Sequence, residues 1–138
     1  MQRIVIDTNV FVSALIQKSY PYHIVNHLFL ANKVSLCISD SVFEEYCAVF
    51  GRKKFSRFPD FYESAQKIIS DIESKSIRYT PTKKIAIISD HDDNKFLELA
   101  LECKAHFLIT GNTNDFTIKS FKRTAIVTPK EYWDSFSS

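Results

Sequence analysis

The chain has 138 residues, a length that fits one domain with its own hydrophobic core. Hydrophobic residues make up 45% of the sequence, and the net charge of +2 is too small to identify a nucleic-acid-binding protein by bulk charge. The two glycines, Gly51 and Gly111, are too few for any glycine-rich phosphate loop. Dinucleotide-binding fingerprints and P-loops are therefore excluded.

The three cysteines, Cys37, Cys47 and Cys103, lie in apolar surroundings and form no Cys-x-x-Cys spacing. We therefore expect reduced, buried thiols in a cytoplasmic protein. The sequence begins Met-Gln-Arg and continues directly into a predicted strand, so we expect no signal peptide. No apolar run approaches the roughly 20 residues that span a bilayer, so no membrane partner is expected.

The first half of the chain predicts strands that alternate with helices. A β-branched run at residues 4–6 predicts a buried strand, and the apolar spacing over 9–17 predicts a helix. Pro21 begins a second helix, and residues 34–38 form a second strand. Asp40 or Ser41 is expected to cap a third helix that runs to about residue 50.

The second half continues the alternation. Residues 51–58 form a basic, aromatic connector, the clearest amphipathic helix follows over 61–72, and segment 81–91 has no clear pattern. The other predicted elements are strands at 77–79, 107–109 and 125–127, a helix over 93–104, a loop over 110–116 and a terminal helix over 129–136. We therefore expect a single α/β domain over 1–138 with a mainly parallel sheet, whose ligands gather at the carboxyl ends of the strands.

Asp7 is the first acidic candidate, because it directly follows the first predicted strand. A carboxylate there is costly to bury unless a cation or hydrogen-bond donor meets it. Capping of the following helix explains the same residue equally well. The second candidate is Glu45, at the edge of the apolar stripe of its helix, whereas Glu44 points nearly opposite. An ordinary glutamate at the helix boundary remains the alternative.

Asp93 shares a helical face with the apolar residues Phe96, Leu97 and Ala100. Complementing the helix dipole is the alternative explanation for an acid in this first turn. Its neighbour Asp92 shares a face with Lys95 and Leu99 and is interpreted as solvated or capping, and His91 as a loop residue. Asn112 and Asp115 follow the strand at 107–109 as further oxygen donors, in a segment that a turn would also explain.

Carboxylates that meet at one place repel each other unless a counter-charge lies among them. Mg²⁺ or Mn²⁺ supplies that charge and prefers oxygen ligands, whereas the sequence lacks the Cys/His spacing of a zinc site. Such an ion can activate a water for in-line attack on a phosphodiester, and two ions can clamp the attacking and leaving oxygens. Convergence of the acids would therefore indicate a Mg²⁺ or Mn²⁺ site capable of such chemistry, but spacing and periodicity do not by themselves identify a nuclease.

The ordered set of four segments resembles the four motifs of PIN domains. The segments are Ile-Val-Ile-Asp-Thr-Asn-Val at 4–10 and residues 38–46, 92–100 and 108–116, in matching order and separation. The resemblance implies a PIN-like three-layer α/β/α sandwich and a Mg²⁺/Mn²⁺-dependent endoribonuclease close to VapC-like toxins of type II toxin–antitoxin pairs. It also implies a homodimer silenced by a small antitoxin.

The same resemblance implies roles for individual residues. Asp7, Glu45 and Asp93 would hold one Mg²⁺ or Mn²⁺, and Asp115, helped by Asn112, would complete a site of one or two ions. The hydroxyls of Thr8 and Ser39 would support it, with Asn9 and Thr110 as further supporting residues. Many relatives have Asp at the position of Asn112, so a second ion would be weakly held or borne by Asp115 alone.

We expect cleavage of single-stranded or loop RNA that leaves a 5′-phosphate and a 3′-hydroxyl. Lys53, Lys54 and Arg57 are expected to guide the RNA, and a second basic run comprises Lys119, Lys122 and Arg123. For either run a solvated face is the alternative. Four nearby aromatics could stack on bases, although core or dimer packing explains them better: Phe55, Phe58, Phe61 and Tyr62.

Three other functions compete with this interpretation. A phosphatase of the haloacid-dehalogenase kind needs a second Asp two residues after the first, but position 9 is Asn. A receiver domain needs a lysine after the fourth strand, which this chain lacks there. The more serious rival is a catalytically silent PIN-like module that binds RNA or a partner protein, and Asn112 keeps this alternative open.

Overall fold

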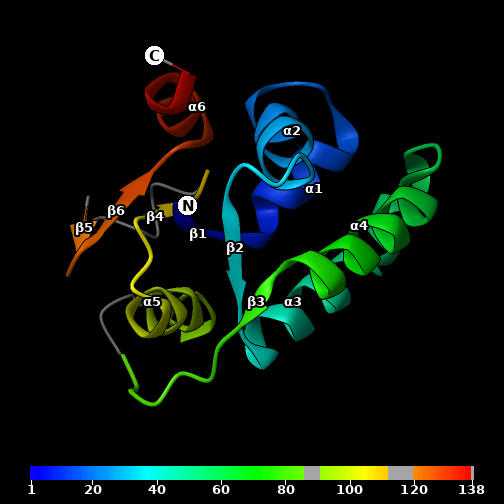
Figure 1. Cartoon of the computed structure of the whole chain (residues 1–138). Helices are drawn as coiled ribbons and strands as arrows, with labels where there is room; N and C mark the ends of the chain where they lie inside the picture. Colours follow the sequence, from blue (N-terminus) through cyan, green and yellow to red (C-terminus); the bar gives the residue numbers. More distant parts are fainter. Residues whose placement is uncertain (86–90, 112–119, 138) are drawn as a thin grey trace.

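The computed structural model in Figure 1 describes residues 1–85, 91–111 and 120–137, with the side chains of 91–93 and 137 outside that description. The described residues form a six-stranded sheet of order β3-β2-β1-β4-β6-β5. The strands are β1 Arg3–Ile6, β2 Ser35–Ile38, β3 Ile77–Arg78, β4 Phe107–Ile109, β5 Ser120–Phe121 and β6 Thr124–Val127.

The sheet is parallel except at one edge. Val5 of β1 pairs with Leu108 of β4, and Leu108 pairs with Ile126 of β6. Among the described strands, only the short β5 runs antiparallel to its neighbour, β6. Strands β1 and β4 are apolar and largely buried, as expected for central strands covered on both faces. The predicted α/β fold with a mainly parallel sheet is therefore confirmed.

Helices cover both faces of the sheet. Figure 1 shows α5 on one side of the strands and α1, α2 and α6 on the other. The helices are α1 Thr8–Ile16, α2 Tyr20–Ile24, the π-helix η1 Val25–Phe29, α3 Asp40–Phe50, the 3-10 helix η2 Lys53–Arg57, α4 Phe61–Lys75, α5 His91–Cys103 and α6 Pro129–Ser137. One buried apolar cluster joins sheet and helices. Within the described residues, no helix is long and apolar enough to cross a membrane.

Several local expectations need correction. The cap of α3 is Ser39, whose hydroxyl accepts from the Val42 amide, rather than Asp40 or Ser41. Helix α5 begins at His91, which was expected in a loop, and ends at Cys103. Leu99 is fully buried because the helix packs against β1, β2 and β4, and the side chain of Asp92 lies outside the described residues.

The thiol prediction is confirmed for two cysteines. Cys37 and Cys103 are buried and free, whereas Cys47 is only half-buried. The apolar run at 85–88 lies mostly outside the described residues, as do Asn112, Asp115 and Lys119.

Candidate functional site

Asp7 lies where β1 ends, at the carboxyl edge of the parallel sheet. Its amide donates to the Ile109 carbonyl of β4 at 2.9 Å, so the strand pairing fixes its backbone. The side chain is only 4% exposed, and its Oδ2 accepts a 2.7 Å hydrogen bond from the Thr110 hydroxyl. Although Asp7 occupies the N-cap position of α1, its carboxylate makes no capping bond. The capping alternative therefore does not explain this acid.

Glu45 is held by donors from two other elements. The Thr8 hydroxyl, next to Asp7, donates to Glu45 Oε2, and the Lys95 ammonium of α5 lies 3.0 Å from Oε1. The Glu45 and Lys95 side chains are 18% and 22% exposed, so water only partly screens their attraction. Glu44 is exposed, which confirms the predicted choice between the adjacent acids.

Tyr46 is a buried residue next to these acids. It is fully buried, and its hydroxyl donates to the carbonyl of Ile6, the residue before Asp7. Burial first, and then the negative charges of Asp7 and Glu45, raise the pKa of Tyr46 well above its ordinary value. The phenol therefore stays protonated and remains a hydrogen-bond donor at neutral pH.

Ser39 and Asn9 take less direct places. Ser39 is 1% exposed, and its hydroxyl caps α3 and lies 3.4 Å from the Ser41 hydroxyl. Asn9 is exposed on α1. Because it caps α3, Ser39 orients the helix that carries Glu45.

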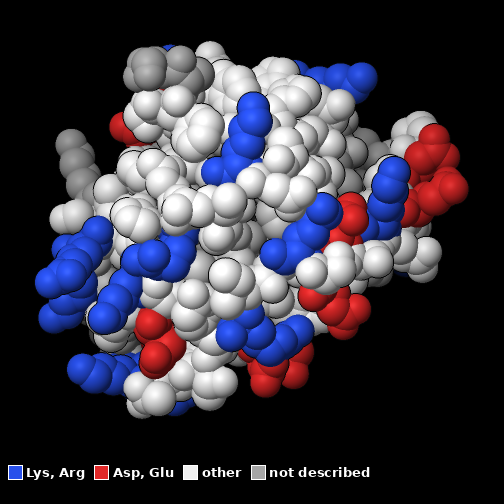
Figure 2. Space-filling view, viewed as in Figure 1, with Lys and Arg blue, Asp and Glu red and all other residues white. Residues whose placement is uncertain are grey.

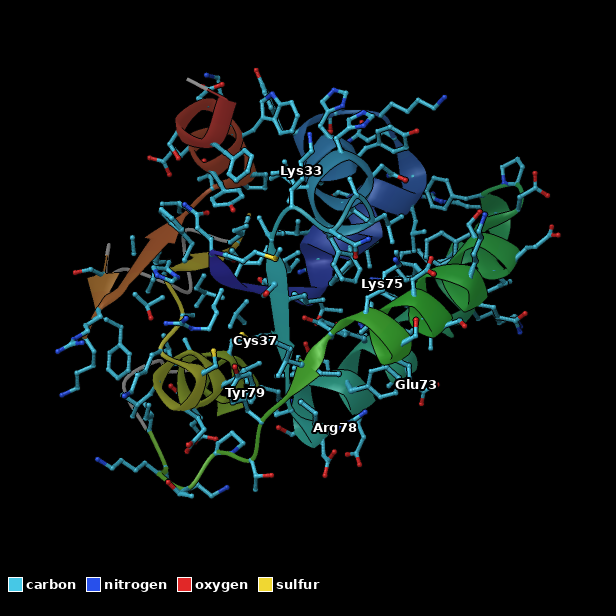
Figure 3. All side chains as sticks on the ribbon, in the orientation of Figure 1. Lys33, Cys37, Glu73, Lys75, Arg78 and Tyr79 are labelled. Atoms are coloured by element: carbon cyan, nitrogen blue, oxygen red, sulfur yellow. The ribbon has the colours of Figure 1, made fainter. Side chains whose placement is uncertain are left out.

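An ion pair between Arg78 of β3 and Asp40 joins the sheet edge to the first turn of α3. Figure 3 labels Arg78 beside that turn.

The first turn of α5 reaches the same place. The Lys95–Glu45 ion pair joins α5 to α3, and Asp93 lies two residues earlier in the same turn. The buried positions of Phe96, Leu97 and Ala100 confirm the predicted apolar face of this helix. The Asp93 side chain, together with Asn112 and Asp115, lies outside the described residues. The structure thus brings together Asp7, Thr8, Glu45 and Thr110 and leaves those three unplaced.

The described donors suit a hard cation. Asp7 and Glu45 offer carboxylate oxygens, with threonine hydroxyls beside them, and oxygen is the ligand that Mg²⁺ and Mn²⁺ prefer. Among the described residues no group of three or more His, Cys, Asp or Glu side chains could hold a metal ion. The two carboxylates fit part of a metal centre, and the rest depends on the acids named above.

Lys95 is the site residue that sequence reasoning missed. Nothing in the spacing between positions 45 and 95 predicts a pair. On the helix Lys95 shares a face with Asp92 rather than with Asp93, so the helical pattern carried no signal for its contact with Glu45. Buried Asn94, only 3% exposed in the same turn, was also overlooked.

The first basic run lies elsewhere on the molecule. Lys53, Lys54 and Arg57 are exposed on η2, which follows the C-terminal end of α3. Core packing, the preferred interpretation of the nearby aromatics, is confirmed for Phe55 and Phe61, because both are buried and stack on each other with ring centroids 4.6 Å apart. These two side chains are therefore not available to stack on bases.

Comparison with known proteins places this geometry in a family. The PIN domain family matches residues 3–114. The uncharacterized protein MJ1680 of Methanocaldococcus jannaschii is 29% identical over 143 residues, covering 97% of this chain and 91% of the relative. A chain from the crystal structure of VapBC2 from Rickettsia felis, bound to a DNA fragment from its promoter, matches with a TM-score of 0.57 at 17% identity. That likeness covers 92% of this chain and 98% of the other. The chain is a member of the PIN domain family.

Proposed function

We propose that the protein is a Mg²⁺- or Mn²⁺-dependent endoribonuclease that cleaves single-stranded or loop RNA. The cation would be held by four carboxylates and one amide: Asp7, Glu45, Asp93, Asp115 and Asn112. Membership of the PIN domain family supports a nuclease. Residues 1–138 would act as one nuclease domain, since the described elements share one sheet and one apolar core.

The hydrogen bond from Thr8 to Glu45 is the observation that carries this proposal. It joins residues 37 positions apart and brings Glu45 beside the end of β1, where Asp7 is buried. Two acids from separate elements at one sheet edge repel each other, and Lys95 compensates only one of the two charges, so a divalent ion bound between them would gain from both. Glu44 on the same helix is exposed, whereas Glu45 is half-buried at this edge of the sheet.

The protein's own groups orient the acids before any ligand arrives. Thr110 holds one oxygen of Asp7, and Thr8 and Lys95 each hold one oxygen of Glu45. A divalent ion bound there supplies the Lewis acid that phosphodiester hydrolysis needs. Lys95 compensates the charge of Glu45, and its flexible side chain would let the ammonium move aside for a divalent ion.

Metal-dependent cleavage of a panel of single-stranded RNAs tests the activity. We expect products with a 5′-phosphate and a 3′-hydroxyl in Mg²⁺ or Mn²⁺, and no cleavage after chelation by EDTA. Full activity of Asp93→Asn would remove this assignment of the site. A protein that binds RNA without cutting it, and that shows no carboxylate-dependent heat on Mn²⁺ titration, would instead be the silent binding module.

We further propose that the nuclease is a homodimer regulated by a small antitoxin. Support comes from the fold likeness to a chain of VapBC2, whose structure contains both components of that complex. Co-expression with the product of a short neighbouring reading frame, followed by size-exclusion chromatography with light scattering, tests this proposal. We expect a complex without nuclease activity, and a free chain that is a dimer. An active, uncomplexed monomer would contradict both statements.

A further inference from the structure

A basic pocket lies at the opposite end of α5 from the acidic site. It has a volume of about 240 Å³, with Ala100 and Leu101 of α5 on its apolar side. Lys104, after the end of α5, and Lys122 and Arg123, in the two-residue turn between β5 and β6, supply its charge. Figure 2 shows basic side chains gathered over the end of α5 and the β5–β6 hairpin, at the left of the view.

The positive charge of this pocket is left available to a ligand. Within the part of the chain that the structure describes, Lys104, Lys122 and Arg123 form no ion pair with a carboxylate, and all three are exposed. Lys122 only approaches the ring of Phe121, at 5.9 Å from its centroid. Three like charges around one pocket repel each other, so an anion that binds there gains from all of them.

Two of the three residues have a backbone conformation that disfavours their side chains. Lys104 has φ of 53° and Lys122 has φ of 55°, both in the left-handed region where glycine is usual. Lys104 holds the position after a helix that glycine usually takes, since the amide of Ala105 donates to Ala100 at 3.0 Å. Keeping lysine at both positions costs stability, which indicates that the side chains serve another purpose.

The structural explanation for Lys104 is already satisfied by another residue. A cation near the end of a helix can complement the dipole and its last carbonyls. Arg3 does this for α5, because its guanidinium donates to the Cys103 carbonyl at 2.9 Å and the Lys104 carbonyl at 3.1 Å. The Thr124 hydroxyl also donates to the Ala105 carbonyl at 2.7 Å and so fixes the hairpin against the helix. The pocket is therefore rigid without the lysine charges.

We propose that this pocket binds a backbone phosphate of the RNA substrate, away from the point of cleavage. This inference rests on the proposed ribonuclease function, which makes RNA the polyanion that the protein must hold. Lys104 lies 11 residues after Asp93, so about 16 Å of helix separates them. An RNA strand that occupies both places must therefore extend several nucleotides beyond the cleaved bond. The apolar side of the pocket suits the face of a base next to that phosphate.

The test measures RNA affinity in EDTA, where no cleavage occurs, with a fluorescent 20-nucleotide single strand and its DNA counterpart. In Lys104→Gly/Lys122→Gly we expect RNA affinity to fall about 10-fold near 0.1 M salt, and the salt slope to shrink by about 1.4. Because glycine suits both backbone positions, the melting temperature should stay equal or rise. Lys104→Arg/Lys122→Arg should retain affinity, and the charge-matched control Lys67→Gln/Lys75→Gln on α4 should change it less than twofold.

Unchanged RNA affinity in the double glycine variant would overturn the inference, as would a loss confined to DNA. Loss of affinity in the arginine variant as well would also overturn it, because the charges would then not be the cause. The proposed function fails separately: a protein that cuts no RNA in Mg²⁺ or Mn²⁺ can still show the affinity loss. If the protein cleaves RNA but the double glycine variant keeps its RNA affinity, the proposed pocket is wrong and the proposed nuclease function stands.

Discussion

The lysines at the two ends of α5 differ in burial and in ion pairing. At the first turn, Lys95 is partly buried and its ammonium is bound to Glu45. Beyond the last turn, Lys104 is exposed, has a left-handed backbone and has no carboxylate partner among the described residues. One end compensates charge within the protein, and the other leaves charge for a ligand. We therefore propose that the carboxyl edge of the sheet binds a cation and the amino edge an anion.

Removing an acid from the carboxyl edge should have the largest effect. We expect Glu45→Gln to lower RNA cleavage more than 100-fold, beyond the 10- to 100-fold that the loss of an outer partner costs. Glu44→Gln is the matched control, because its side chain is exposed on the same helix. Initial rates on one RNA substrate in Mn²⁺ compare them. Equal rates for the two variants would show that the inward position of Glu45 has no functional meaning.

Thr110 should rank next, because it orients Asp7 without being a carboxylate itself. Thr110→Val keeps the shape and removes the 2.7 Å hydrogen bond to Oδ2, so we expect Mn²⁺ affinity to fall about 10- to 100-fold. Calorimetry measures that affinity. Thr128→Val is the control, because the Thr128 hydroxyl caps α6 instead. Equal Mn²⁺ affinities in both variants would contradict an orienting role for Thr110.

Lys95 should have a smaller effect of the opposite sign on metal binding. Its ammonium competes with a divalent ion for Glu45, so Lys95→Gln should tighten Mn²⁺ binding by a factor of about 2–5, within the range of a partly screened pair. The metal-free variant should also be less stable by up to about 1 kcal/mol. Calorimetric titration and urea unfolding measure the two quantities. Weaker Mn²⁺ binding in Lys95→Gln would instead make Lys95 a support of the occupied site.

The contribution of Tyr46 to the free energy of unfolding should decline only at alkaline pH. Its pKa is raised in the fold, so its contribution is complete below the unfolded value near 10 and declines as pH rises above it. For each pH unit above 10, the free energy of unfolding should fall by about 1.4 kcal/mol more in the wild-type protein than in Tyr46→Phe, until the pH reaches the pKa of Tyr46 in the folded state. Urea unfolding at pH 8 to 11 measures this difference. Parallel curves for the two proteins would show that the phenol does not titrate as described.

Periodicity predicted what depends on one element at a time. Turning α3 at 100° per residue separated Glu45 from Glu44, and the same reasoning identified the buried face of α5. The β-branched run before Asp7 predicted a central strand for the same reason. These predictions succeeded because burial imposes a pattern on neighbouring residues.

Features that leave no periodic pattern in the sequence were not predictable in this way. Three consecutive residues, Ser39, Asp40 and Ser41, are all good caps, so only the backbone shows which one is used. The turn of π-helix at 25–29 was missed because its apolar stripe resembles that of an α-helix. The two-residue strand β5 is too short to show an alternating pattern. The left-handed backbone at Lys104 and Lys122 was not predictable because glycine is the residue usually found in that conformation.

The most direct test of the central claim is a double-mutant cycle on Mn²⁺ binding, with Asp7→Asn, Glu45→Gln and the combined variant measured by calorimetry. If both carboxylates share one ion, each single change should weaken binding strongly, and the double variant should be little worse than either single variant. Independent losses that simply add, or Mn²⁺ binding that survives both changes, would contradict a shared cation at the end of β1.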